Sequence, residues 1–151
     1  MVHLELLCSI DAHYTEGHFP KPYGNDNGFG WGLGEGTVSG QRLSGTFKWS
    51  NHKITRSDGV ASPTVRGVIT TGDGHKVLVE LTGRTVFVSQ GDEQVGNQLL
   101  MTLFESDAHR YAWLNNEVCF SEGRISPAEG APFHLEVYLC KNGSTDTSVG
   151  A

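Results

Sequence analysis

Hydrophobic and polar residues alternate along most of this chain, which is the two-residue period of a β-strand. Residues 2–10 show the pattern first, with Val2 through Ile10 at even positions on one face. Further alternating stretches follow at 43–50, 63–71, 75–83, 84–90, 98–106, 116–125 and 132–142. The sequence Gly-Asp-Gly at 72–74 predicts a hairpin turn. A single helical turn is expected around 107–115. About eight to ten strands joined by short turns predict an all-β fold, a barrel or a sandwich.

Three segments break the alternation. Residues 11–27 have no period and contain two prolines, so we expect a long loop there. Residues 142–151 are polar and are expected to form a flexible tail. Between 28 and 36 every second residue is glycine, which leaves one face of a strand without side chains. We favour close packing against this bare face over space for a ligand.

Composition narrows the class of protein. The chain has 151 residues and predicts one domain, residues 1–151. Its formal net charge of −6, with scattered basic residues, gives no sign of a nucleic-acid or membrane partner. Three cysteines, no secretion signal and no apolar span predict a cytoplasmic protein with reduced thiols. Neither metal-ligand spacing nor a dinucleotide fingerprint is present, so no metal and no cofactor are expected.

Three stretches carry a family resemblance: GTVSGQRLSGTF, SDGVASPTVRGVITTGDGHKVLVE and ESDAHRYAWLNNEVCFSEGRI. Together they resemble a bacterial and fungal family called domain of unknown function 3237. The match covers about residues 34–140, and its most specific part is the motif RYAWLN at 110–115. The chain departs from the family's G-x-G-R pattern near Glu122. The resemblance implies a compact antiparallel β-barrel, lipocalin-like in outline, and implies no chemistry.

Two arrangements of the strand faces fit this barrel. Residues 76–84 have an apolar face and a mixed face; the apolar face holds Val77, Val79 and Leu81, the mixed face Lys76, Leu78, Glu80, Thr82 and Arg84. In the first arrangement the apolar faces fill a dry lumen and the mixed faces meet water. In the second the mixed faces line a ligand-filled lumen. The first is more common, whereas the apolar content of the mixed faces, the space beside the glycine-rich strand and the aromatic residues argue for the second, so both arrangements stay open.

Arg66 and Glu80 are the leading catalytic candidates. Counted back from the turn at 72–74, they fall at nearly symmetric positions and are expected to be cross-strand neighbours. In a lumen, Glu80 would be a general base and Arg66 an anion clamp. On the surface they would be an ordinary ion pair. Asp58 is a further catalytic candidate, although a turn-forming role suits its position before Gly59 better.

Aromatic residues supply the expected wall of a substrate site. The candidates are Trp31, Trp49, Tyr111, Trp113 and Tyr138. Within the RYAWLN motif, Trp113 and Asn115 are expected to be architectural, whereas Tyr111 is expected to face a pocket. His13 and His18, in the predicted loop, are weaker candidates for closing the barrel mouth.

The function that these features favour is a cofactor-free enzyme acting on a small, apolar, oxygenated metabolite. The expected reaction class is proton transfer, as in an isomerase, cyclase or dehydratase of secondary metabolism. The alternatives are a barrel that binds a small molecule without chemistry and a barrel with a dry core. Covered apolar faces would make the protein a homodimer.

Overall fold

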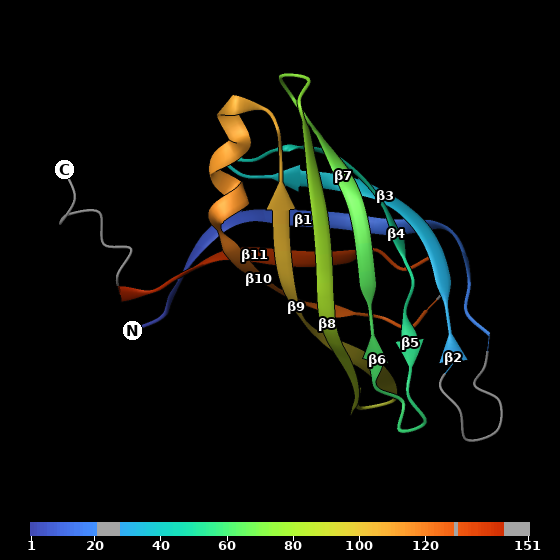
Figure 1. Ribbon diagram of the computed structural model, residues 1–151. Coiled ribbons are helices and arrows are strands. Elements are labelled where there is room, and N and C mark those ends of the chain that lie inside the picture. The colour runs from blue at the N-terminus through green and yellow to red at the C-terminus, as the bar shows by residue number, and fades with distance from the viewer. Residues whose placement is uncertain (21–27, 129, 144–151) are drawn as a thin grey trace.

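The structure, a computed structural model, describes residues 1–20, 28–128 and 130–143. It confirms the antiparallel β-barrel (Figure 1). Eight strands close on themselves in the order β8–β7–β4–β3–β1–β11–β10–β9, and β9 pairs with β8 again. They are β1 (His3–His18), β3 (Trp31–Ser39), β4 (Gly45–Asn51), β7 (Thr64–Thr71), β8 (Lys76–Gln90), β9 (Glu93–Glu105), β10 (Val118–Ile125) and β11 (Phe133–Lys141). Three two-residue strands extend the sheet: β2 (Gly28–Phe29), β5 (Ile54–Thr55) and β6 (Ala61–Ser62).

The first strand is longer than the sequence predicts. β1 continues to His18, so the expected loop is wrong for residues 11–18. The strand persists because Ala12 and Tyr14 continue the inward alternation that begins at Ile10, and because β3 pairs with it as far as Trp31. Of the rest of the predicted loop, residues 19–20 are described and residues 21–27 lie outside the described residues, as does the predicted tail from residue 144 onward.

A β-bulge in β1 changes which residues face the core. The register with β11 shifts between Leu6 and Cys8, so that Leu7 and Cys8 are both buried. A bulge places an extra residue in one strand and moves every later side chain to the other face. Leu4 and Leu6 therefore point outward and are 55% and 62% exposed. The predicted common face of Leu4, Leu6, Cys8 and Ile10 is wrong for this reason.

The apolar faces of the strands point into the barrel and the mixed faces point out. Val77, Val79 and Leu81 of β8 are no more than 3% exposed, and β11 buries its matching face through Leu135, Val137 and Leu139. Burial of apolar area stabilises the fold by roughly 25 cal/mol per Å². The arrangement in which the mixed faces line the lumen is therefore wrong.

The bare face of β3 is a packing surface for aromatic rings, which confirms the close-packing interpretation. A Cβ atom at Gly34 would lie 2.1 Å from Cζ2 of Trp49, and one at Gly32 would lie 2.5 Å from Cε1 of Tyr14. Both rings thus rest directly against the β3 backbone. The other face of β3 carries Trp31, which is 38% exposed.

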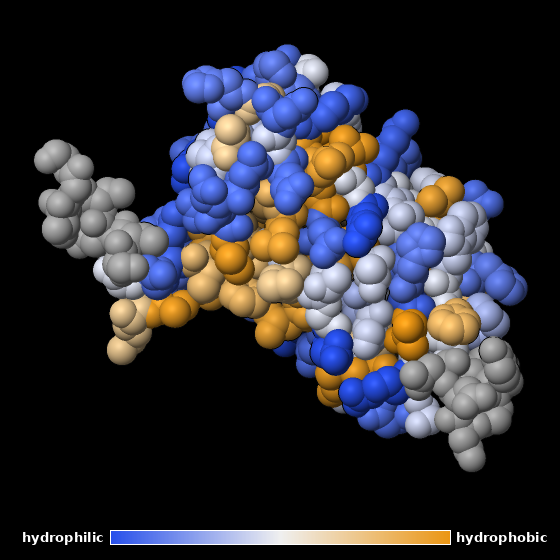
Figure 2. All heavy atoms as spheres, viewed as in Figure 1, coloured by the Kyte–Doolittle hydropathy of each residue, from blue (hydrophilic) through white to orange (hydrophobic). Residues whose placement is uncertain are grey.

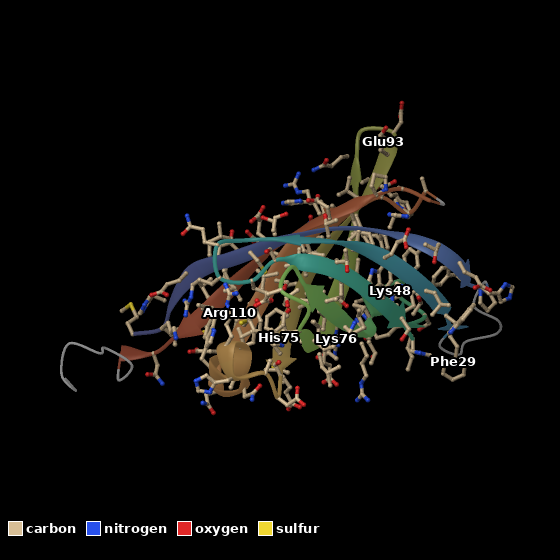
Figure 3. All side chains as sticks on the ribbon, turned by 90° about the horizontal axis from the view of Figure 1, so that it is seen from above. Phe29, Lys48, His75, Lys76, Glu93 and Arg110 are labelled. Carbon is tan, nitrogen blue, oxygen red and sulfur yellow. The ribbon has the colours of Figure 1, made fainter. Side chains whose placement is uncertain are left out.

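One end of the barrel is closed by the RYAWLN motif. The expected helical turn is a 3₁₀-helix, η1 (His109–Asn116). The Tyr111 hydroxyl donates to Oδ1 of Asp73 at 2.9 Å, and the Arg110 guanidinium reaches its Oδ2 at 2.7 Å. Thr71 donates to the same carboxylate, and Thr71, Tyr111 and Arg110 together hold the pKa of Asp73 well below its usual range. Figure 3 shows Arg110 beside His75 at this end.

The remaining residues of the motif fasten η1 to the strands around it. The Asn115 amide accepts from the backbone N–H of Ser106 at 2.8 Å and donates to its carbonyl at 2.9 Å. The Ser106 hydroxyl donates to the carbonyl of Lys76 at the start of β8. The Arg42 guanidinium lies 3.8 Å from the Trp113 ring centroid. The motif therefore closes one end of the barrel.

Candidate ligand-binding site

A cavity of about 570 Å³ opens at the barrel end opposite η1. Its lining comes from the end of β1, the start of β11, the end of β10 and the middle of β8, all distant from η1 along their strands. The floor is apolar and is formed by Ile10, Leu81, Leu100 and Leu135. A cavity of this size with an apolar floor suits a small organic molecule.

Tyr14 is the centre of an aromatic wall in this cavity. Its ring lies 4.8 Å from that of Trp49, 5.3 Å from Phe19 and 6.3 Å from Phe133, measured between centroids. Most of these contacts are edge-to-face or tilted, the geometry that aromatic pairs prefer. The wall is positioned by β3, because its glycines leave the space that Tyr14 and Trp49 fill.

A buried amide fixes the orientation of the Tyr14 hydroxyl. Asn51, which is 5% exposed, accepts from the backbone N–H of Thr64 at 3.1 Å and donates to the Tyr14 hydroxyl oxygen at 2.8 Å. The hydroxyl hydrogen has no acceptor among the residues that the structure describes. Burial raises the pKa of Tyr14, so it is a neutral phenol at neutral pH. It is therefore a preset hydrogen-bond donor at the cavity wall.

The cavity contains two other kinds of polar group. Deeper in, Gln98 donates to the Thr85 hydroxyl at 2.9 Å. The mouth is lined by Lys53 and by the end of β1. There Glu16 and His18 are register partners of Leu33 and Trp31, so their exposed side chains lie on the outer side of the rim. The buried indole N–H of Trp49 has no hydrogen-bond partner within the described part of the chain. The site thus combines an apolar body with a few polar positions, which fix the orientation of a ligand in such pockets.

The predicted catalytic pair lies on the outside of the barrel. Arg66 and Glu80 are paired in register, as expected, and Nε of Arg66 lies 3.0 Å from Oε2 of Glu80. Their side chains are 75% and 39% exposed, because both belong to mixed faces. Their expected lumen position is wrong. They form a surface ion pair, which contributes little to stability.

The other predicted site residues occupy several places. Asp58 lies in an exposed turn, where it accepts from the backbone of Val60 and binds the Arg56 guanidinium. That contact lowers the pKa of Asp58 to about 2. Tyr138 faces outward and donates to Glu122 at 3.3 Å.

Among the predicted aromatic wall residues, Trp49 is the one that lines the cavity. Trp31 is on the outer face of β3, and Tyr111 and Trp113 belong to the closed end. Tyr111 therefore differs from its expected position facing a pocket. The two candidate histidines lie in different places. His18 lies at the cavity rim, whereas His13 lies beside Glu35, with 3.5 Å between its Nε2 and Oε1 of Glu35.

Sequence reasoning missed Tyr14, Asn51, Lys53 and Phe133. Tyr14 was missed because residues 11–27 were predicted to form a loop. Ile10, Ala12 and Tyr14 nevertheless keep the two-residue spacing of a strand. Phe133 begins the apolar face of β11, and the alternation alone does not distinguish a cavity wall from a packed core at this position. Nothing in the sequence marks Asn51 or Lys53, because their positions depend on which strands become neighbours.

The family follows from comparison with known proteins. A family model described as "Protein of unknown function (DUF3237)" matches residues 3–140. The chain belongs to this family. No curated protein matches the chain.

Several solved structures share the fold of this chain at low sequence identity. A β-barrel-like protein of Acinetobacter baumannii has a TM-score of 0.81 and 18% identity, covering 93% of this chain and 97% of that one. A protein of unknown function from Clostridium acetobutylicum has a TM-score of 0.80 and 17% identity, with 93% and 100% covered. An enzyme from Penicillium herquei has a TM-score of 0.72 and 19% identity, with 93% and 95% covered. These similarities establish the barrel and no activity.

The residues described are 1–20, 28–128 and 130–143. No helix among them is long and apolar enough to cross a membrane. Within the same residues, no three His, Cys, Asp or Glu side chains are grouped as ligands of a metal ion.

Proposed function

We propose that this DUF3237 protein binds a small, largely apolar, oxygen-bearing molecule in the barrel cavity and catalyses proton transfer on it. The observation that carries the proposal is the Tyr14 hydroxyl, oriented by Asn51 at the wall of an apolar cavity of about 570 Å³. A positioned donor in a site that excludes water stabilises negative charge as it develops on a substrate oxygen.

The proton-transfer group in this proposal is His18. It lies at the cavity rim, where its register partner is the outward-facing Trp31, so its imidazole has to turn over the rim to meet a ligand. Imidazole is the side chain most often used as a general acid or base. Tyr14 would hold the substrate oxygen while His18 removes or returns a proton at a neighbouring carbon. A positioned acid or base of this kind is worth roughly 10²–10⁴-fold in rate. The similarity of the fold to that of an enzyme from Penicillium herquei is in keeping with the proposal.

A binding protein without catalysis is the second candidate. It is favoured by the exposure of His18 and Glu16, since both are at the mouth and neither is held by a partner within the described residues. Native mass spectrometry of the purified protein identifies the bound molecule. Incubation of that molecule with the protein in D₂O then separates the two functions, because deuterium enters carbon positions only if a proton is transferred.

Replacement of Tyr14 by phenylalanine tests the donor. We expect Tyr14→Phe to lower the affinity for the ketone 1-tetralone about fivefold, because one neutral hydrogen bond is worth about 1 kcal/mol. The affinity for the hydrocarbon tetralin, which cannot accept that bond, is expected to change less than twofold. Both affinities are measured by displacement of the fluorescent probe N-phenyl-1-naphthylamine. Equal losses for the two compounds would show that Tyr14 acts through packing. If neither compound displaces the probe, the cavity is not a binding site.

A further inference from the structure

Lys53 is held over the cavity mouth from two sides. Its backbone carbonyl accepts from the N–H of Gly30 at 2.9 Å, and its stem lies where a Gly30 side chain would otherwise be: a Cβ there would meet Lys53 Cγ at 2.9 Å. Its ammonium lies 4.7 Å from the centroid of the Phe19 ring. A lysine side chain is usually free to move, so this packing gives the charge a defined position at the mouth.

The ammonium has no carboxylate partner within the described residues. Some other cations among the described residues do have one, such as Arg56 with Asp58, Arg110 with Asp73 and Lys141 with Glu117. Others in the described part of the chain that have none, such as Arg42, Lys48 and Arg84, are more exposed to water than Lys53. Lys53 is partly buried, and burial lowers its pKa. An anion delivered by a ligand would restore the electrostatic balance at this position.

We infer that the ligand of this cavity carries an anionic oxygen group, such as a carboxylate, sulfonate or phenolate, that binds Lys53 at the mouth. The inference rests on the proposed function, because it assumes that the cavity is occupied. The apolar body of the ligand would then point to the floor at Leu81 and Leu100, and a second oxygen would meet Tyr14. Glu16 on the same rim disfavours a ligand with a second negative charge nearby.

Two fluorescent probes that differ only in a sulfonate test the inference. 8-Anilino-1-naphthalenesulfonate has the anion, and N-phenyl-1-naphthylamine lacks it. We expect Lys53→Met to lower the affinity for the sulfonate probe about tenfold, because a hydrogen bond between charged groups is stronger than a neutral one. The affinity for the neutral probe is expected to stay within twofold of the wild-type value. Lys53→Arg keeps the charge and is expected to retain sulfonate binding within about threefold.

The outcomes separate the two proposals. If neither probe binds, the proposed function fails. If both bind and Lys53→Met leaves the sulfonate probe unchanged, or weakens both equally, the ligand does not use Lys53. Because such probes also adhere to exposed apolar surfaces, Leu78→Ser on the outer face of β8 is the control, and it is expected to leave both affinities unchanged.

A second inference concerns the outer face of β9, β10 and β11, and a different set of residues carries it. Apolar side chains form rows across these strands: Tyr138, Phe120 and Met101 are successive register partners, and Leu99 and Val118 flank them. Leu99 is 61% exposed and Met101 41%. Figure 2 shows apolar side chains gathered on this face below the helix. Contiguous exposed apolar area marks an interaction surface.

The charges beside this surface indicate that its partner is a second copy of the chain. One row reads Glu136, Glu122, Leu99 and Arg84 across β11, β10, β9 and β8, so it is acidic at one end and basic at the other. A two-fold axis along the strands, between β9 and β10, reverses the row in the second copy. Arg84 then falls opposite Glu136 and beside Glu122, while Phe120 packs on Met101 of the other copy.

We propose that two copies associate through this face. At about 10 μM, light scattering after size-exclusion chromatography is expected to give twice the chain mass of 16.4 kDa. Met101→Glu and Arg84→Glu are each expected to give folded monomers, because each places a carboxylate in an apolar or acidic setting. Arg84→Glu combined with Glu136→Arg is expected to restore the dimer, because it exchanges the two charges that face each other across the axis. A wild-type monomer, or a double variant that stays monomeric, would overturn this arrangement.

Discussion

Gly34→Ala is expected to lower the free energy of unfolding by about 3 kcal/mol, a large effect for one methyl group. The new Cβ would lie 2.1 Å from Cζ2 of Trp49 and 2.6 Å from the carbonyl oxygen of His13. The ring can rotate only against the aromatic wall of Tyr14, and the carbonyl belongs to the paired strand β1, so neither neighbour yields easily. The melting temperature should fall by roughly 6–12 °C.

Gly72→Ala is the matched control for this experiment. Gly72 lies in the β7–β8 turn, a Cβ there would meet nothing within 4 Å, and its backbone is not in the left-handed region. We expect its free energy of unfolding to stay within about 0.5 kcal/mol of the wild-type value. If the two variants are equally stable, the aromatic rings do not depend on the bare face of β3, and the account of how the cavity wall is positioned is wrong.

Tyr111→Ala is expected to lower the free energy of unfolding by about 4 kcal/mol. Tyr111 is 4% exposed, so the variant leaves a large cavity, and it also removes the hydroxyl that binds Asp73. Affinity for N-phenyl-1-naphthylamine is expected to stay within twofold under conditions where the variant is folded, because Tyr111 is at the closed end of the barrel. Chemical denaturation and probe titration measure the two quantities.

Tyr111→Phe divides that effect into its parts. It keeps the buried ring and removes only the hydrogen bond, so its loss of stability should be clearly smaller than that of Tyr111→Ala. A Tyr111→Ala protein that is folded but loses probe binding would mean that the RYAWLN motif takes part in the site. The motif would then be more than the closure described above.

The alternation of the sequence predicted the barrel well, for a physical reason. A strand with one buried face must repeat with period two, and the turn at 72–74 fixes the register of its hairpin, so Arg66 was correctly paired with Glu80. The same local information does not say which face is inside. Leu78 and Tyr138 suggested a lumen wall, yet both lie on the outer surface.

The candidate site was predicted poorly because it depends on contacts between distant parts of the chain. Trp49 was found, since it shares a face with Phe47 in a clear strand pattern. Tyr14 becomes a wall residue only when β1 pairs with β3 and the glycines there leave room for its ring. Asn51 becomes its partner through a hydrogen bond across 37 positions of sequence. Local patterns carry no information about such pairings.

The pairing of β1 with β11 has a consequence for biosynthesis. Nine register pairs join residues 3–12 to residues 133–141, so the barrel closes between its first and last strands. During translation β1 can pair with β3 early, but its other edge must wait until residue 141 has left the ribosome. Exposed strand edges invite pairing with other chains. The nascent chain therefore carries an open edge at Leu7–Ile10 for nearly the whole of its synthesis, and this is where a chaperone would be needed most.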